Sequence, residues 1–319
     1  MIKVDNSIIE YLKTAKYFSS TIIPLQVDAS KRKYFRIKKG KKSLIAVDSS
    51  LEKKSLLNFS IMAEWLRKEG YSSPMIYDIN LNKGYSVMED FGDKKFSKLL
   101  EANKNNMSSI YKQTIKLLAN LSNNKTPNFL KPFSERVFIK ELLVFIDWYK
   151  YHNKIKNKKE VEEWDTIWNK LYSDATADKY KTVVLRDFHV DNIFLLEKRI
   201  GIKKIGLIDF QDALIGHPSY DLVSLTQDVR VKNFYIKEKE LLELYLQNYK
   251  NNQSNFYTSY LIFGTQRLLK IIGIFKRLEY KYNKKDYLKF LPKTWKLLKN
   301  NLEHVIFKDL KKWFNNYGY

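Results

Sequence analysis

The stretch VVLRDFHVDNIFLL, residues 183–196, places two aspartates, a histidine and an asparagine between two apolar runs. A second stretch, IGLIDFQDALIGHPSYDLVSL at residues 205–225, has another apolar run that ends in an aspartate. Short apolar runs bounded by turn residues predict β-strands. The sequence therefore predicts two loops, each at the end of a strand, in which polar side chains are concentrated.

The positions of these polar side chains follow the pattern of a phosphoryl-transfer site. Asp187 precedes Asn192 by five positions, and Asp209 follows a later strand. Protein kinases have the same spacing between the aspartate that accepts the hydroxyl proton and an asparagine that binds Mg²⁺, and a later strand-end aspartate also binds Mg²⁺. Aspartate and asparagine are also common in ordinary turns. We favour the active-site interpretation because two such loops occur, each next to an apolar strand.

The chemistry of phosphoryl transfer explains the choice of residue types. The reaction concentrates charge on phosphate oxygens, so it depends on positioning and on hard cations. Mg²⁺ prefers oxygen ligands, which suits Asn192 and Asp209. The sequence therefore predicts Asp187 as the base, these two residues as metal ligands, and ATP and Mg²⁺ as cofactors.

The composition is that of a globular protein with many basic residues. The chain has 319 residues, of which 44% are hydrophobic, and a formal net charge of +23. Basic surfaces attract nucleic acids through counterion release, so a nucleic-acid-binding protein is the alternative from another functional class. The lysines are scattered along the whole chain, however, and no recognisable nucleic-acid-binding module accompanies them. We therefore expect no specific nucleic-acid partner and see no sign of an obligate protein partner.

The sequence also contains features that depend on the cellular compartment of a protein. It contains no cysteine, which excludes disulfides and is typical of a reducing compartment. Residues 1–18 include acidic side chains and no long apolar core, unlike a secretory signal. No uncharged run approaches the ~20 residues that a membrane-spanning helix requires. We expect a soluble, cytoplasmic protein without a membrane partner.

Two kinds of pattern divide the chain near residues 91–93. Before this point, short alternating runs predict strands at residues 33–39, 43–49, 74–80 and 84–91, with one helix at 56–70. After it, apolar residues at helical spacing predict helices at 108–122, 138–152, 162–174, 260–278 and 294–314. We therefore predict an α+β fold with a β-rich, nucleotide-binding lobe at residues 1–92 and a mostly helical, catalytic and substrate-binding lobe at 93–319.

The two polar stretches resemble the motifs of a known superfamily. LRDFHVDN and LIDFQDALIGHPSYDLVSL are similar to the Brenner-type motifs of the aminoglycoside phosphotransferase and choline kinase superfamily. The resemblance implies a two-lobed, protein-kinase-like fold, with Asp187 as catalytic base and Asn192 and Asp209 as Mg²⁺ ligands. It also implies that Asp221 is a structural anchor on the helix that follows.

A narrower resemblance extends over most of the chain. VDASKRKYFRI, ELLVFIDWY, DFQDALIGHPSYDLVSLTQD and GTQRLLKIIGIFKRL are together similar to bacterial anomeric kinases of N-acetylmuramate and N-acetylglucosamine. Those enzymes place phosphate on the C1 hydroxyl in cell-wall recycling. The resemblance implies a small amino sugar as the acceptor. An aminoglycoside or choline kinase of the same fold is the alternative.

The predicted nucleotide-binding lobe departs from the kinase pattern. Kinases have a glycine-rich loop over the phosphates and a strand lysine paired with a helix glutamate. Here the corresponding loop, DASKRKYF, has no glycine, and the lysine and glutamate are both missing from the expected places. The predicted nucleotide ligands are instead the backbone around Ser30 and Lys31, the side chain of Arg36 followed by those of Arg32 and Lys33, and Glu89. The alternative is that these basic residues only face solvent.

The predicted acceptor site draws on one helix and on the loop of Asp187. A sugar needs polar groups for its hydroxyls and an aromatic face for its ring. The segment ELLVFIDWY offers Glu141, Asp147 and Trp148, and Arg186 is a candidate partner for the lactyl carboxylate of N-acetylmuramate. The alternative is that Trp148 belongs to the core and that Glu141 is solvated.

Overall fold

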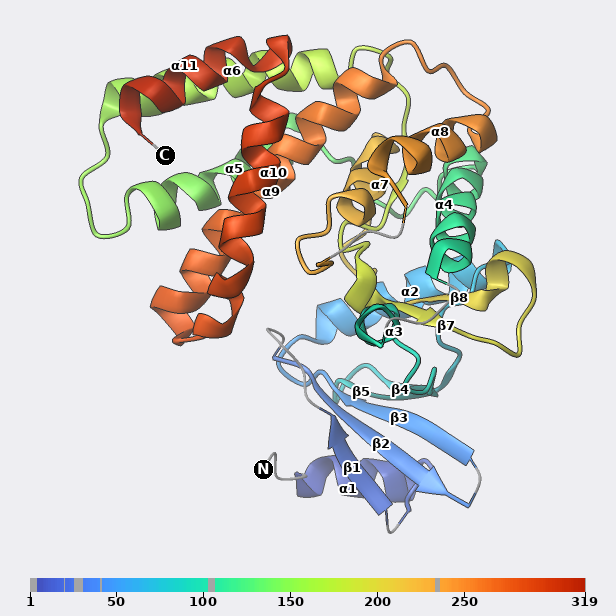
Figure 1. The fold of residues 1–319 in the computed structure, drawn as a ribbon. Helices are drawn as coiled ribbons and strands as arrows, with labels where there is room; N and C mark the ends of the chain where they lie inside the picture. Colours follow the sequence, from blue (N-terminus) through green and yellow to red (C-terminus); the bar gives the residue numbers. More distant parts are fainter. Residues whose placement is uncertain are drawn as a thin grey trace. The chain divides into compact units, whose positions relative to one another are not determined.

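The computed structural model describes residues 5–19, 21–25, 31–40, 42–102, 107–232 and 236–318. They form two units (Figure 1): unit 1 is Met1–Thr114 with Asp191–Ala213, and unit 2 is Ile115–Val190 with Leu214–Tyr319. The chain leaves unit 1 within helix α4 (Met107–Asn123) and re-enters it within the short helix η2 (Val190–Asn192). Unit 1 thus includes residues 93–114 and 191–213, while the functional division expected between residues 92 and 93 stays a prediction.

A five-stranded antiparallel sheet lies at the centre of unit 1, with the strand order β1-β2-β3-β5-β4. The strands are β1 (Thr21–Leu25), β2 (Lys33–Lys39), β3 (Lys42–Asp48), β4 (Ile76–Asn80) and β5 (Tyr85–Glu89). Helix α2 (Lys53–Lys68) connects β3 to β4. The four predicted strands and the predicted helix between them are confirmed. Helix α1 (Asn6–Thr14) and strand β1 are additional to the predicted elements.

The core of the sheet forms against α1. Ile8 and Leu12 of this helix are fully buried and pack with Phe35, Ile37 and Val87 of the strands. Each fully buried side chain of this size stabilises the fold by about 1.5–3 kcal/mol through removal of apolar surface from water. The N-terminal helix therefore belongs to the packed structure of unit 1.

A second, two-stranded sheet of unit 1 carries polar residues at its ends. Strands β7 (Ile193–Leu195) and β8 (Ile205–Leu207) pair antiparallel, and the short helix η3 (Gly201–Lys204) precedes β8. The ring of Phe210, just after β8, stacks on Phe59 of α2 with centroids 4.8 Å apart. The remaining helix of this unit, α3 (Phe96–Glu101), lies next to β7.

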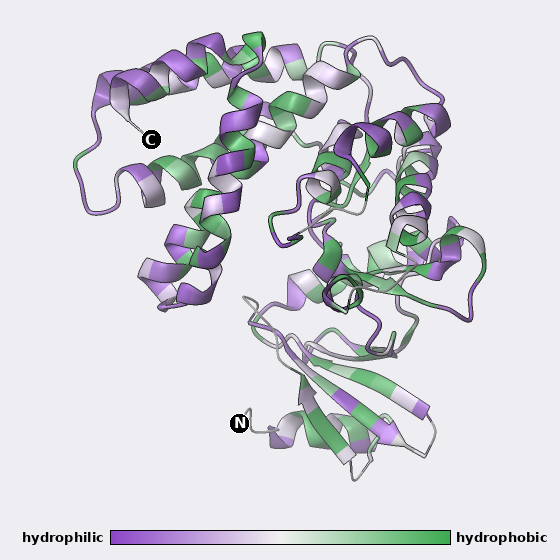
Figure 2. Cartoon of the chain, in the orientation of Figure 1, coloured by the Kyte–Doolittle hydropathy of each residue, from purple (hydrophilic) through white to green (hydrophobic). Residues whose placement is uncertain are grey.

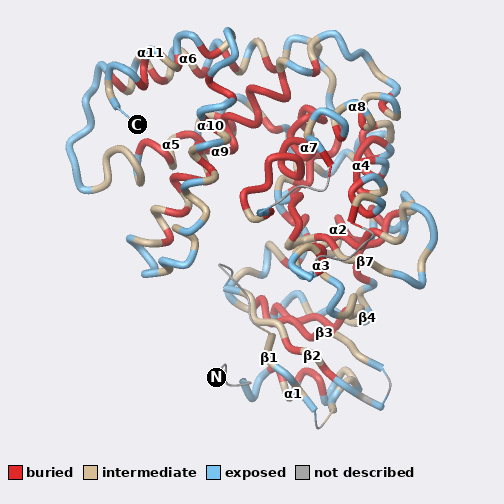
Figure 3. The backbone as a smooth tube through the Cα atoms, in the orientation of Figure 1, coloured by how far each residue is buried: buried red, intermediate tan, exposed pale blue. Residues whose placement is uncertain are grey.

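Unit 2 is mostly helical. Besides the C-terminal part of α4, its helices in the described residues are α5 (Glu135–Phe145), the π-helix η1 (Ile146–Lys150), α6 (Lys158–Ala175), α7 (Ser219–Thr226), α8 (Glu238–Asn248), α9 (Phe256–Tyr282), η4 (Lys285–Phe290), α10 (Leu291–Leu302), η5 (Val305–Phe307) and α11 (Lys308–Tyr317). A short antiparallel ladder joins β6 (Thr182–Val184) to β9 (Leu214–Gly216). Helix α9 is buried along most of its length, as the red tube in Figure 3 shows. None of the helices within the described part of the chain is long and apolar enough to cross a membrane.

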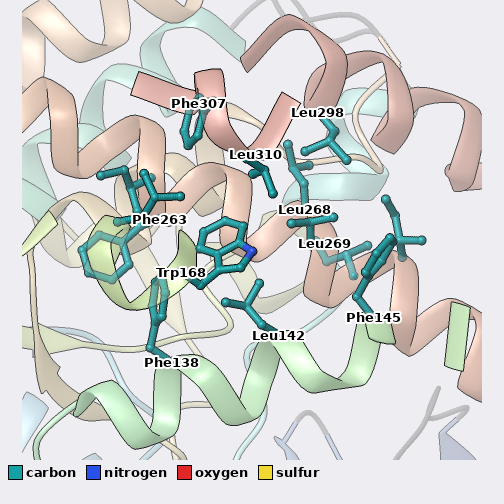
Figure 4. Close-up of a cluster of buried hydrophobic side chains, with 14 of the residues drawn as sticks. Phe138, Leu142, Phe145, Trp168, Phe263, Leu268, Leu269, Leu298, Phe307 and Leu310 are labelled. Carbon is teal, nitrogen blue, oxygen red and sulfur yellow. The ribbon is translucent and has the colours of Figure 1, made fainter. Parts of the chain in front are cut away.

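Aromatic side chains dominate the core of unit 2. In Figure 4, Phe138 and Leu142 of α5 and Phe263 of α9 lie around Trp168 of α6. The indole N–H of Trp313 donates to the carbonyl of Glu160 at 3.0 Å, so its polar atom is satisfied inside the core. Figure 2 shows mostly hydrophilic colours on the visible sides of α6 and α11, in agreement with the predicted amphipathic pattern.

Helices α5 and α9 approach each other backbone to backbone. A Cβ atom added to Gly273 of α9 would lie 2.4 Å from the carbonyl oxygen of Val144 on α5. Only glycine permits this separation, because the obstructing atom belongs to the backbone and cannot rotate away. The close approach brings polar side chains of the two helices together one turn earlier along α9.

The prediction of one continuous helix at residues 294–314 is wrong. The segment forms α10, η5 and α11 instead, and His304, which has an extended backbone, separates α10 from η5. Val305, an apolar residue in the middle of this segment, is 78% exposed, whereas Leu310 is buried. The division allows α10 to pack on α9 and α11 to pack on α6, which a single straight helix could not do.

Candidate functional site

Asp187 lies on a short loop of unit 2 that follows β6. Its side chain is exposed, whereas Leu185 and Phe188 on either side are buried. The loop therefore presents one carboxylate to solvent above two buried apolar side chains. This placement suits a base that must reach the hydroxyl group of a bound molecule.

Two buried aspartates hold this loop through its backbone. Asp221 accepts hydrogen bonds from the N–H groups of Leu185 at 2.6 Å and of Arg186 at 2.9 Å. Asp228 accepts one from the N–H group of Val190 at 3.0 Å. Arg186 has a φ of 71°, a left-handed conformation that costs about 1–2 kcal/mol for a residue with a side chain. The hydrogen bonds therefore stabilise a strained loop in one conformation.

Asp221 acts as the anchor that the resemblance implies. Burial raises the pKa of Asp221 to about 7, although the N–H groups of Leu185 and Arg186 oppose the shift by favouring the carboxylate. Asp228, two residues after the end of α7, is an additional anchor and lies outside the predicted set. Its partner, the N–H group of Val190, is 38 positions away in the sequence, so only the folded structure shows this role.

A buried polar cluster lies next to the loop, and we call it the Glu141 cluster. It consists of Glu141, Arg186, Tyr220, Gln266 and Lys270. Oε1 of Glu141 accepts hydrogen bonds from Nη2 of Arg186 and from Nζ of Lys270, the latter at 2.6 Å. Oε2 accepts from Nε2 of Gln266 at 3.0 Å and from the hydroxyl of Tyr220 at 3.4 Å. A carboxylate has about four acceptor sites, so the carboxylate of Glu141 is saturated.

The cluster brings two predicted acceptor residues together, Glu141 and Arg186. Glu141 is buried, so the interpretation of this residue as a solvated one is wrong. Because protein donors already occupy its oxygens, Glu141 is better suited to hold Arg186 and Lys270 in place than to bind a sugar hydroxyl. Its predicted contact with the acceptor stays a prediction.

The Glu141 cluster makes the protein less stable in acid. Burial by itself would raise the pKa of Glu141, but Lys270 and Arg186 outweigh it and lower the pKa to about 2, from an ordinary value of 4.5. A depressed pKa in the folded state contributes stability that is present above pH 4.5 and is lost as the pH falls towards 2. A difference of this size corresponds to a contribution on the order of 3 kcal/mol from this one group to the free energy of unfolding.

We therefore expect urea unfolding between pH 2.5 and 7 to show a steep loss of stability below pH 4.5 that Glu141→Gln flattens. The variant should also be less stable at pH 7, because Arg186 and Lys270 lose their carboxylate. Glu162→Gln on the surface of α6 is the control and should keep the slope of the natural protein. An unchanged acid slope in Glu141→Gln would contradict the expectation.

Asn192 and Asp209 lie next to each other in unit 1. Asn192 immediately precedes β7 and Asp209 follows β8, and these two strands are paired. Nδ2 of Asn192 donates to Oδ2 of Asp209 at 3.4 Å, while Oδ1 accepts from Nε2 of Gln211 at 2.9 Å and from Nη2 of Arg32 at 3.0 Å. The structure thus brings together the two residues predicted as metal ligands.

The donor types of this pair fit Mg²⁺. Carboxylate and amide oxygens are hard ligands, and Mg²⁺ keeps several waters, so it needs few ligands from the protein. Asp209 has a φ of 62°, which directs its backbone out of the strand path immediately after β8. No group of three or more His, Asp or Glu side chains able to hold a metal occurs within the residues that the structure describes.

The residues predicted to bind the nucleotide have different surroundings. Ser30 lies outside the described residues, and Lys31 is exposed. Arg36 pairs with Asp90 and Asp93, its Nη1 lying 2.9 Å from Oδ1 of Asp93. Arg32 contacts Asp209 and also lies near Glu52. Of the two arginines, only Arg32 contacts a residue predicted to bind the metal.

Glu89, at the end of β5, connects two segments of unit 1. Its carboxylate accepts hydrogen bonds from Arg199 and from the N–H group of Met75, the latter at 3.2 Å. These contacts tie β5 to the loop before β4 and to the loop after β7. A direct contact of Glu89 with a nucleotide stays a prediction.

Asp147 and Trp148 lie on the π-helix η1, at the end of α5. Asp147 is exposed and its Oδ1 lies 2.6 Å from Nζ of Lys156. Trp148 is partly exposed and stacks on His152 with ring centroids 5.3 Å apart. Single π-helical turns inside α-helices are frequent at functional sites. Trp148 is therefore not a fully buried core residue, and the acceptor roles of both residues stay predictions.

The sequence interpretation missed Tyr220 of the Glu141 cluster and the two polar residues that α9 contributes to it, Gln266 and Lys270. Both belong to GTQRLLK, a segment of an otherwise apolar, buried helix. Polar side chains repeated at helical spacing within a buried apolar helix need partners, because an unpaired buried polar group costs free energy. This pattern was the signal that could have located them.

The chain is similar to curated and structurally characterised enzymes. It is 27% identical to the N-acetylmuramate/N-acetylglucosamine kinase of Caulobacter vibrioides over 91% of this chain and 90% of that protein. Among solved structures, a choline/ethanolamine kinase family protein from Mesorhizobium loti has a TM-score of 0.67 at 13% identity and covers 97% of this chain and 98% of its own. The ADP-bound aminoglycoside phosphotransferase APH(2″)-Ib has a TM-score of 0.60 at 16% identity, with 95% and 99% covered.

The structural matches confirm the predicted fold class. They extend over nearly the whole chain, and unit 1 contains an antiparallel sheet while unit 2 is mostly helical. The fold is therefore α+β and protein-kinase-like. Residues 21–255, well over half of the chain, match the model of the phosphotransferase enzyme family. The chain belongs to this phosphotransferase enzyme family and is a kinase.

Proposed function

We propose that this kinase transfers the γ-phosphoryl group of ATP to the anomeric C1 hydroxyl of N-acetylmuramate or N-acetylglucosamine, in cytoplasmic cell-wall recycling. The observation that carries the proposal is the Asp187 loop, an exposed carboxylate on a backbone held by Asp221 and Asp228. The similarity to a kinase of these two sugars over 91% of the chain supports the choice of acceptor.

Asp187 is the proposed base. Its carboxylate would accept a hydrogen bond from the C1 hydroxyl, orient the oxygen towards the γ-phosphorus and take up the proton. The bond between this oxygen and the γ-phosphorus forms, and the bond from the γ-phosphorus to the bridging oxygen of ADP breaks. The anchored loop supports this role because a base must be held in place to act on a bound hydroxyl.

Asn192 and Asp209 are the proposed ligands of Mg²⁺. When bound, the metal supplies positive charge to the β- and γ-phosphate oxygens. The hydrogen bonds from Gln211 and Asn192 orient the carboxylate of Asp209. The five-residue spacing from Asp187 to Asn192, which matches that of protein kinases, supports the assignment.

Arg32 is the cation that we propose for the phosphates, ahead of Arg36. Its side chain is 11% exposed and contacts Asp209, the proposed metal ligand. Arg36 pairs instead with Asp90 and Asp93, neither of which is a proposed metal ligand. Lys31 and the backbone at Ser30 stay candidates for covering the phosphates.

Arg32→Ala is expected to raise the KM for ATP by about tenfold or more, because a hydrogen bond to a charged group contributes about 1.5–3 kcal/mol. Arg36→Ala should lower the melting temperature and change the KM for ATP little, since this arginine joins β2 to Asp90 and Asp93. Steady-state kinetics with varied ATP would measure both. A higher KM for ATP in Arg36→Ala but not in Arg32→Ala would indicate that Arg36 binds the phosphates.

Phosphorus NMR of the reaction product tests the proposed function. The enzyme is incubated with ATP, Mg²⁺ and either N-acetylmuramate or N-acetylglucosamine. An anomeric sugar phosphate is the expected product, identified by the coupling of phosphorus to the C1 proton. If neither sugar is phosphorylated while kanamycin or choline is, the acceptor assignment is wrong and the phosphotransferase activity remains.

A further inference from the structure

Helix α9 carries two cationic side chains one turn apart in a buried segment. Arg267 and Lys270 are three positions apart and therefore share a face of the helix. Arg267 is 5% exposed, and its Nη1 has no hydrogen-bond partner among the residues described by the structure. A buried cation is costly unless negative charge balances it. Arg267 and Lys270 therefore need negative charge near this face of α9.

Cations outnumber carboxylates around the Glu141 cluster. Lys270 and Arg186 share the single carboxylate of Glu141, and Arg267 adds a third positive charge. Asp187 supplies the second negative charge, and its field acts on all three cations. Three positive charges thus face two negative ones.

The two anchoring aspartates do not remove this excess. Asp228 also acts on Arg267, but it is paired with Arg230, with Oδ1 lying 3.3 Å from Nη1, so this pair adds no net charge. Burial raises the pKa of Asp221, which disfavours its charged form, and its two carboxylate oxygens accept from the backbone N–H groups of Leu185 and Arg186. Positive charge therefore remains in excess next to Asp187, where the acceptor of the reaction would bind.

The ammonium group of Lys270 has more donors than the hydrogen bonds that it makes to its neighbours in the cluster. An ammonium group has three N–H donors. Within the described part of the chain, Nζ of Lys270 donates to Oε1 of Glu141 at 2.6 Å and to the hydroxyl of Tyr220 at 3.3 Å. The side chains of Lys270 and Arg186 are 15% and 21% exposed, so a ligand can reach both.

We propose that Lys270, together with Arg186, binds a carboxylate of the acceptor, so that the enzyme prefers an acidic amino sugar over a neutral one. N-acetylmuramate carries such a carboxylate on its lactyl ether, and N-acetylglucosamine has none. The charge of Asp187 acts on both Arg186 and Lys270, so a carboxylate bound by these cations lies near the proposed base. Glu141 holds the two cations in position. This inference rests on the proposed function, because it concerns the acceptor of that reaction.

The test compares the two sugars in Lys270→Met. The kcat/KM for N-acetylmuramate should fall by about 10- to 100-fold, the effect of one hydrogen bond between charged groups. The kcat/KM for N-acetylglucosamine should change much less. Lys270→Arg, which keeps the charge, should retain the preference for the acidic sugar. Lys276→Met is the matched control on the same helix, since Lys276 pairs with Glu279, and it should leave both values unchanged.

Equal losses with the two sugars would overturn the inference and make Lys270 a purely structural residue. Unchanged kinetics would also overturn it. If Lys270→Met fails to fold, ionic strength tests the natural protein, because added salt should raise the KM of N-acetylmuramate more than that of N-acetylglucosamine. Equal salt effects would count against an anion subsite.

Calorimetric binding of each sugar without ATP separates this inference from the proposed function. Tighter binding of N-acetylmuramate that disappears in Lys270→Met supports the carboxylate subsite even if neither sugar is phosphorylated. Phosphorylation of both sugars with equal affinity supports the proposed function and overturns the inference. Absence of a binding preference in the natural protein overturns it as well.

Discussion

Asp187→Asn is expected to lower kcat by about 10²- to 10⁴-fold, the range that a positioned base contributes to catalysis. The amide has nearly the size and shape of the carboxylate but cannot take up the proton of the acceptor hydroxyl. The side chain is exposed, and the hydrogen bonds that hold the loop come from its backbone, so the variant should fold normally. Initial rates of ADP formation and a thermal unfolding curve would measure both effects.

The binding constants of Asp187→Asn provide a second readout. Removing a group that acts only in the transition state lowers kcat without weakening substrate binding. Because Arg186, Arg267 and Lys270 lose a neighbouring negative charge, an anionic acceptor should bind no more weakly than before. Asp286→Asn, an exposed position of η4 in the same unit, is the control and should keep the full rate. An Asp187→Asn variant with a rate close to that of the natural protein would exclude Asp187 as the base.

Local sequence patterns predicted most elements of unit 1, because alternation along a strand reflects burial directly. In β2, for example, Phe35 and Ile37 are buried while Tyr34 and Arg36, which alternate with them, are partly exposed. Strand β1 was harder to predict, because it is short and contains Pro24. Proline cannot donate to a sheet ladder and is found mainly on edge strands, and β1 is at the edge of the sheet.

The candidate site was predictable only where its residues lie close together in the sequence. The spacing from Asp187 to Asn192 is local and follows a known pattern. The contacts of Arg32 with Asp209 and of Glu141 with Lys270 join residues 177 and 129 positions apart. A single sequence contains no information on such pairings until the chain is folded. Arg36 was therefore placed ahead of Arg32, although only the folded structure shows that Arg36 is paired with Asp90 and Asp93.

The division of the predicted helix at 294–314 has a similar cause. The apolar residues in this segment have helical spacing, but they belong to two helices that pack on different partners. Periodicity describes one helix face and does not report a change of partner. His304 gives a local sign of the division, because its ring accepts a hydrogen bond from the N–H group of Ile306 and begins a new helical turn.

Asp209→Asn is the second variant for which we expect a large effect, a fall in kcat of about 10²- to 10³-fold, comparable to the loss of one preorganised electrostatic contact. The carboxylate is the one charged member of the proposed metal pair. Asparagine tolerates the left-handed φ of 62° at this position, so the backbone should stay in place. The loss should therefore reflect the charge of the side chain and its affinity for the metal.

Metal titrations separate this effect from a general loss of function. The Asp209→Asn variant should need a higher Mg²⁺ concentration for half-maximal rate, and its binding of Mn²⁺ in the presence of ADP, followed by electron paramagnetic resonance, should weaken. Asp212→Asn, three residues further on and exposed, is the matched control and should leave the metal requirement unchanged. Because Arg32 loses one of its anionic partners in Asp209→Asn and keeps Glu52, the thermal stability of unit 1 should also fall slightly. A variant that keeps the Mg²⁺ and Mn²⁺ affinities of the natural protein would show that Asp209 does not hold the metal.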